Sequence, residues 1–212
     1  MTLSAADIDA DAGVEGNARL TALNGMVLLV LLAVEGFTVL GVRQMITLHV
    51  YLGVLLLGPV LLKCASTMYR FARYYLGATP YVRRGPPHIA MRILGPVVIL
   101  ASLAVIGTGI GLIYTGPSHR EPLLTLHQGS FIVWVAAMSI HVLGHVVEAS
   151  RQTWHELRDR SAPSVIRARR WRSVAVALSL VGGVGLATAL LPSAHAWTTG
   201  NFERFDHIRR SH

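Results

Sequence analysis

The sequence predicts an all-α integral membrane protein, an up-down bundle of five transmembrane helices. Hydrophobic residues make up 52% of the 212 residues and charged residues only 14%, an unusual balance for a water-soluble domain of this size. The chain also contains apolar runs of the length, about 20 residues, that a helix needs to cross the hydrocarbon core of a membrane. Five such runs cover residues 20–42, 45–68, 91–115, 124–148 and 172–192.

The connections between these runs predict how the helices are ordered. A tight turn follows the first run, and a short segment rich in Gly and Pro follows the third. Short connections place consecutive helices side by side and antiparallel. We therefore expect a transmembrane domain at 20–192, preceded by a disordered cytoplasmic tail at 1–19 and followed by an external tail at 193–212.

Arginine content predicts the orientation of the bundle. The connections at 69–92 and 149–172 hold five and seven arginines, whereas the opposite side has Arg43, Arg120 and three tail arginines. Lys and Arg concentrate in cytoplasmic loops, so we expect the N-terminus inside and the C-terminus outside a bacterial plasma membrane. The first 19 residues are acidic and lack the basic segment of a cleavable signal peptide.

Several classes of function lack their motifs in this chain. The single cysteine, Cys64, allows neither an intramolecular disulfide nor a cysteine-based metal site. We find no phosphate-binding glycine loop, no nucleophile motif and no His-Glu-x-x-His zinc motif. A hydrolytic or ATP-driven enzyme is therefore disfavoured.

Four histidines lie inside the apolar runs, where ionisable side chains are costly and usually face the bundle interior or a functional cavity. Three of them, His127, His141 and His145, project from one stripe of the fourth run. His127 and His141 are 14 residues apart, which is about 21 Å along a helix. Neutral imidazole binds haem iron, so this spacing suits two haems at two depths.

His49 in the second run is the candidate partner of His127. Each lies about one turn inside the outer end of its run, so the two residues share one depth. We expect them to bind an outer haem as a bis-histidine pair, with Gly53 and Gly129 leaving room for the porphyrin. The alternative is two polar residues that are hydrogen-bonded within the bundle.

The inner depth is irregular because Lys63 stands 14 residues after His49. Three arrangements are open. His141 or His145 binds a second haem with His88 at the base of the third run; Lys63 supplies an amine ligand; or Lys63 pairs with Glu148 or a haem propionate and no inner haem exists.

Each charged residue in or near the spans has two possible roles. The candidates for binding haem propionates at the inner boundary are Arg70, Arg73 and Arg92, which could equally contact lipid phosphates. Glu35 lies in the middle of the first run. We interpret it either as a protonated structural residue or as a proton acceptor near a quinol site.

The histidine segments resemble those of bacterial membrane cytochromes b, the cytochrome b561-like, ferric-reductase-like and dehydrogenase cytochrome b subunits. The segments are Leu48-His49-Val50-Tyr51-Leu52-Gly53, Leu126-His127-Gln128-Gly129-Ser130-Phe131 and His141-Val142-Leu143-Gly144-His145. The resemblance covers about residues 45–148 and implies a haem-binding four-helix core. It implies His49 and His127 as axial ligands of one haem and His141 as a ligand of another. Lys63 stands where the fourth histidine is expected.

The sequence therefore predicts a b-type haem protein that passes electrons between a membrane quinone pool and a partner redox protein. We expect an electron-transfer subunit of an oxidoreductase rather than a stand-alone enzyme. Two alternatives differ in class: a haem-free transporter or proton-relay protein, and a membrane anchor subunit of a redox complex.

Overall fold

The computed structural model describes residues 5–83, 85, 89–158 and 163–198, and every regular element in these ranges is helical. The helices are α1 Ala5–Leu40, α2 Ile46–Leu55, α3 Leu57–Tyr75, α4 Thr79–Arg83, α5 Ile89–Thr115, α6 Leu123–Arg158, α7 Pro163–Leu190 and α8 His195–Thr198, with 3₁₀ turns at Pro117–His119 and Leu191–Ala194. Five stretches are long and apolar enough to cross a membrane: Gly13–Leu40, Ile46–Tyr75, Arg92–Thr115, Leu123–His155 and Ala168–Trp197. The expected fold class and the five spans are confirmed.

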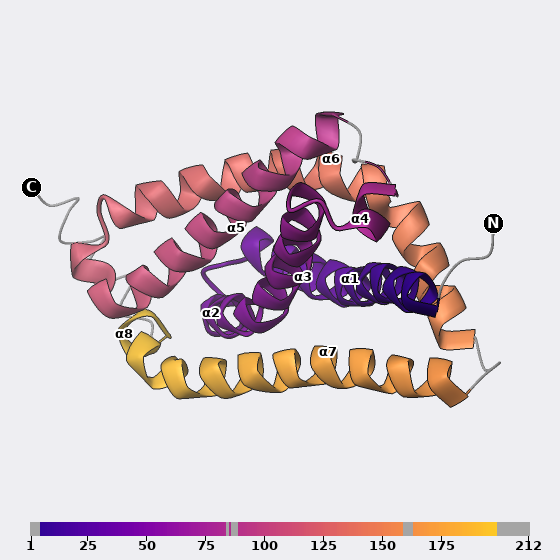
Figure 1. The fold of residues 1–212 in the computed structure, drawn as a ribbon. Coiled ribbons are helices and arrows are strands. Elements are labelled where there is room, and N and C mark those ends of the chain that lie inside the picture. The colour runs from indigo at the N-terminus through magenta and orange to yellow at the C-terminus, as the bar shows by residue number, and fades with distance from the viewer. Residues whose placement is uncertain (1–4, 84, 86–88, 159–162, 199–212) are drawn as a thin grey trace, which may run out of the picture.

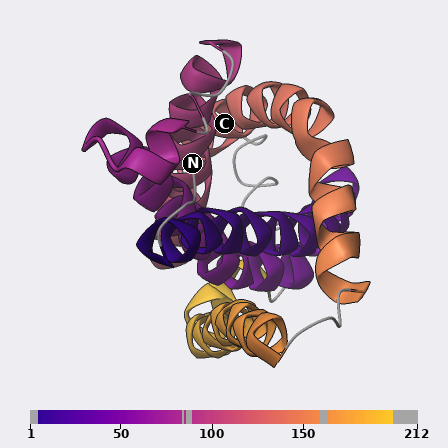
Figure 2. The ribbon, with the colours of Figure 1, turned by 45° about the vertical axis from the view of Figure 1, so that its right-hand side comes forward.

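The helices form a bundle with α7 on one side, the α5–α6 pair on the other and α1–α3 between them (Figures 1 and 2). α5 packs along α6, α2 and α3 pack against α7, and α1 packs against both α3 and α6. The connections at 41–45 and 116–122 mark what we call the short-loop end. The connections at 76–88 and 159–162 mark the opposite end, which we call the long-loop end after the 13-residue connection at 76–88.

The second span is broken into α2 and α3 at Leu56. Pro59 has no backbone N–H to offer the carbonyl of Leu55, which explains a break at this place. α7 crosses the second span here, and a glycine of each helix lies at the crossing, Gly58 on α3 and Gly183 on α7. A side chain at Gly58 would collide with the carbonyl of Ser179, and one at Gly183 would collide with the carbonyl of Leu55. Small residues thus let two helical backbones approach closely.

Polar contacts add to the packing of α1 on α3. Asn24 is fully buried, and its Nδ2 donates to the carbonyl of Pro59 at 2.8 Å. Asn17 Nδ2 donates to the carbonyl of Ser66 at 3.1 Å. Many large apolar side chains point outward, as expected for helices whose solvent is lipid. The helices therefore meet through two small apolar clusters and through polar and small-residue contacts rather than through one large core.

Both terminal boundaries differ from the sequence-based expectation. α1 begins at Ala5, so most of the segment 1–19 that we expected to be disordered is helical. Glu15 and Arg19 form an ion pair of 3.0 Å one turn apart, and Val14 is buried, which extends the helix beyond the apolar run. At the other end, the indole of Trp197 is buried and donates to the carbonyl of Leu112 at 2.7 Å. The start of the expected external tail is thus packed against α5.

Candidate functional site

The structure brings His49 and His127 together near the short-loop end. His49 lies in the first turn of α2 and His127 in the first turns of α6. Their ring centres are 6.4 Å apart, and the ring planes are inclined by 80°. Two histidines that are 78 residues apart in the sequence therefore face one another across the bundle.

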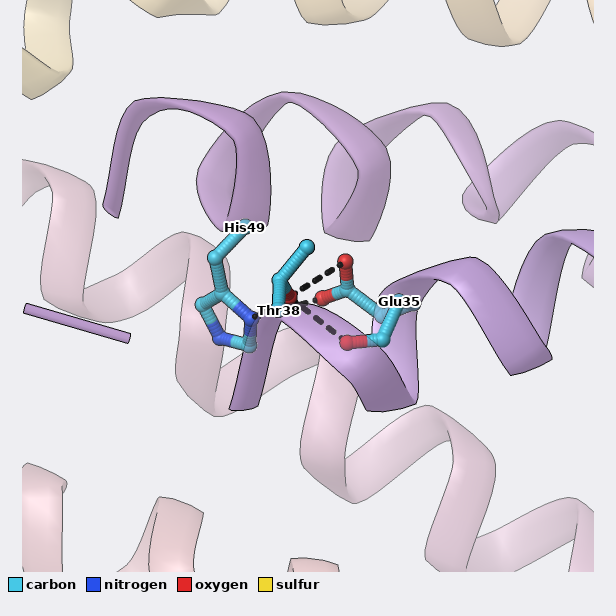
Figure 3. Close-up of polar contacts among 3 residues, drawn as sticks. All are labelled: Glu35, Thr38 and His49. Carbon is cyan, nitrogen blue, oxygen red and sulfur yellow. Dashed lines mark hydrogen bonds and ion pairs between the residues drawn. The ribbon is translucent and has the colours of Figure 1, made fainter. Parts of the chain in front are cut away.

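Thr38 and Glu35, both on α1, contact the His49 ring at Nδ1 (Figure 3). The Thr38 hydroxyl donates its only hydrogen to Glu35, either to the backbone carbonyl at 2.6 Å or to Oε2 at 3.3 Å. Its oxygen lies 3.0 Å from His49 Nδ1 and can accept from it while the hydroxyl hydrogen goes to Glu35. Glu35 Oε1 is also 2.9 Å from Nδ1. With an ionised Glu35, the hydrogen of a neutral His49 ring is on Nδ1, and Nε2 carries the lone pair.

His127 is contacted at the same ring nitrogen, Nδ1, by Thr108 of α5. The Thr108 hydroxyl can donate to the carbonyl of Ala104 at 2.6 Å, and its oxygen can then accept from His127 Nδ1 at 3.1 Å. The backbone of Val105 is also near the ring. Gly109 admits the ring, because a Cβ there would lie 3.2 Å from His127 Cε1.

This pair can act as two axial ligands. Within the part of the chain that the structure describes, the side-chain partners of both rings are on Nδ1, so each Nε2 has no side-chain partner. Two imidazoles that bind one metal from opposite sides at about 2 Å have ring centres roughly 6 to 6.5 Å apart, as here. No three His, Cys, Asp or Glu side chains of the described residues gather at a metal-ion site. Two facing imidazoles could hold a metal that brings further ligands of its own, as haem iron does.

The two glycines that we expected to make room for a porphyrin face different surroundings. A Cβ at Gly53 would lie 3.4 Å from Glu35 Oε1, so Gly53 makes room for the carboxylate. A Cβ at Gly129 would have no neighbouring atom within 4 Å. Of the two, Gly129 is the one that faces open space.

Deeper in the bundle, His141 and His145 share one face of α6, with ring centres 4.8 Å apart. Lys63 is within electrostatic range of both rings. Its Nζ, however, donates to the carbonyl of Thr21 at 2.7 Å. Glu148, which we considered as a partner of Lys63, accepts from the side chain of Gln152 instead. His88 lies outside the described residues, so the facing ligand of a second haem is not assigned.

The candidate propionate ligands lie at the long-loop end. Arg70 follows His49 by 21 residues, which is about 32 Å along a helix. Arg73 lies one turn further, with its guanidinium 5.8 Å from the ring centre of Tyr81. Arg92 is in the first turns of α5. All three side chains are exposed, and none is near the His49–His127 pair.

Sequence reasoning missed the residues that orient the two rings. We considered Glu35 only as a structural residue or a proton acceptor, and we did not single out Thr38, Thr108 or Gly109. One signal was present, because Thr108 stands between two glycines in a span that otherwise carries few polar residues. No family model matches the chain, and no curated protein or solved structure matches it either. Function is therefore argued from the geometry of the site.

Proposed function

We propose that this chain is a membrane b-type haem protein that transfers electrons between a quinone pool and a partner redox protein. One observation carries the proposal. Two imidazoles lie 6.4 Å apart, and the side-chain contacts of each ring are on Nδ1, which leaves Nε2 for a metal. Each ring is also hydrogen-bonded to a neighbouring helix, as the alternative of two polar bundle residues requires, so the presence of haem decides between the two.

In this proposal His49 and His127 are the axial ligands of one haem b. The bound haem supplies reversible one-electron chemistry. Thr38 and Thr108 hold the Nδ1 hydrogens, which fixes the direction of both rings before any ligand enters. The apolar surfaces of the surrounding helices keep water from the site. The chain itself moves no proton in this step and serves as an electron-transfer subunit rather than a stand-alone enzyme.

A second haem at the depth of His141 belongs to the same proposal. His141 is its ligand on α6 by the 14-residue spacing, with His145 as the alternative. The other ligand is His88 or Lys63. Lys63 would have to exchange its hydrogen bond to the Thr21 carbonyl for iron, which favours His88.

The orientation in the membrane is also proposed from charge. The arginine-rich connections of the long-loop end would face the cytoplasm, which places both termini of the chain as expected from the positive-inside rule. The His49–His127 pair would then lie near the external face of a bacterial plasma membrane. Arg70, Arg73 and Arg92 would contact cytoplasmic lipid phosphates or a second haem.

The test is a reduced-minus-oxidised absorption spectrum of the purified protein together with a count of haem per polypeptide. We expect a bis-histidine b-type spectrum and at least one haem. His49→Ala and His127→Ala should each remove the haem of this pair. His119→Ala, which changes an exposed histidine at the same end of the bundle, should keep it. Full haem content in both single variants of the pair would exclude it as the ligand set.

A second candidate function is a haem-free proton relay, and the contact between Glu35 and His49 favours it. Their side chains are 14% and 21% exposed and form an ion pair of 2.9 Å if the histidine is protonated. Buried carboxylate–histidine pairs in membrane spans occur in proton pathways. A colourless protein that drives proton uptake into vesicles, with loss of uptake in Glu35→Gln, would establish this function instead.

A further inference from the structure

The two imidazoles of the pair differ in what accepts their Nδ1 hydrogens. His49 faces the carboxylate of Glu35 at 2.9 Å as well as the Thr38 hydroxyl. His127 faces the hydroxyl of Thr108 and the backbone of Val105, both of which are neutral. The site is therefore chemically asymmetric, and α1 supplies the asymmetry.

We propose that Glu35 is a positioning residue that acts through His49 to lower the reduction potential of the haem held by the pair. This inference rests on the proposed function. A carboxylate that accepts the Nδ1 hydrogen makes the imidazole a more electron-donating ligand and favours oxidised iron. Reduction adds one electron, taken from a one-electron donor, and removes one positive charge from the site. A fixed negative neighbour in a low-dielectric span therefore disfavours reduction.

The surroundings of Glu35 hold its carboxylate against His49. The Thr38 hydroxyl lies 2.6 Å from the Glu35 backbone carbonyl and 3.3 Å from Oε2, so it can donate to either. Gly53 on α2 leaves the space that Oε1 occupies, since a Cβ there would lie 3.4 Å away. Thr38 on α1 and Gly53 on α2 thus both support the contact between Glu35 and His49, although a carboxylate in an apolar span is costly.

The experiment is a potentiometric titration of haem absorbance in full-length purified Glu35→Gln and wild-type protein. Glutamine keeps the shape and the acceptor oxygen but removes the charge. We expect retained haem and a 10- to 100-fold lower ratio of oxidised to reduced haem at a given ambient potential. At 59 mV per tenfold for one electron, the midpoint rises by about 59 to 118 mV. The matched control is Glu15→Gln, which makes the same change on α1 20 residues from Glu35 and should shift the ratio by less than threefold.

The outcomes separate this inference from the proposed function. Full haem content in Glu35→Gln with a ratio within threefold of wild type overturns the role of Glu35 and leaves the haem proposal intact. If Glu35→Gln binds no haem, Glu35→Asp decides, because it keeps the charge but shortens the reach to Nδ1. A raised potential in Glu35→Asp supports the inference, and an unchanged one overturns it. Wild-type protein that carries no haem overturns both.

Discussion

The crossing of α7 over the α2–α3 break offers a sharp test of the bundle. Gly183 is buried at this crossing, and a Cβ there would overlap the carbonyl oxygen of Leu55 and lie 3.1 Å from its carbonyl carbon. Both atoms belong to the backbone, so relief requires that one helix moves away from the other. We predict that Gly183→Ala separates α7 from α2 and lowers the free energy of unfolding.

Two opposing effects determine how much Gly183→Ala changes the free energy of unfolding. Overpacking at a tight contact costs about 1 to 3 kcal/mol. Replacing Gly by Ala inside a helix recovers up to about 1 kcal/mol of helix propensity. The upper part of the overpacking range applies, because no side chain can rotate out of the way. The net effect should be a loss of about 1 to 2 kcal/mol.

The flanking glycines of α7 provide matched controls. Cβ atoms at Gly182 and Gly185 would have no neighbouring atom within 4 Å. Gly182→Ala and Gly185→Ala should therefore be neutral or stabilising by up to about 1 kcal/mol. The assay is equilibrium unfolding of each variant in mixed detergent micelles, followed by helical circular dichroism. If Gly183→Ala is as stable as Gly182→Ala, the close crossing of α7 and α2 is refuted.

Three further predictions concern the site and the topology. Thr108→Val removes the acceptor of the His127 Nδ1 hydrogen and should weaken haem binding about 10- to 100-fold, as measured by haem titration; unchanged affinity would contradict the assignment of the tautomer. If a second haem is bound by the Lys63 amine, Lys63→Met and His141→Ala should each lower the haem count by one. A lower haem count in His141→Ala alone would point to another ligand facing His141. An unchanged haem count in both variants would remove His141 from the ligand set. Reporter fusions in the two arginine-rich connections should report the cytoplasm and fusions in the C-terminal tail the exterior; a cytoplasmic tail would overturn the orientation.

Depth along the membrane normal could be predicted from the sequence, because position within an apolar run measures depth directly. His49 lies three residues after the first residue of α2 and His127 four residues after the first residue of α6, at the short-loop end in both cases. The five spans follow for the same reason, since lipid demands long unbroken apolar runs. The beginning of α1 could not be predicted from hydropathy, because the part of the helix before the apolar run is polar, with Asn17 bonded to α3 and Glu15 paired with Arg19.

The sequence by itself therefore determined the number of spans and the common depth of His49 and His127. Only the tertiary structure decided what each ring faces. Contacts across helices depend on crossing angles and on rotation about each helix axis, which no periodicity within one helix specifies. That geometry places Glu35 beside His49 and Thr108 beside His127. It also directs Lys63 towards the Thr21 carbonyl in the backbone of α1 and not towards a carboxylate.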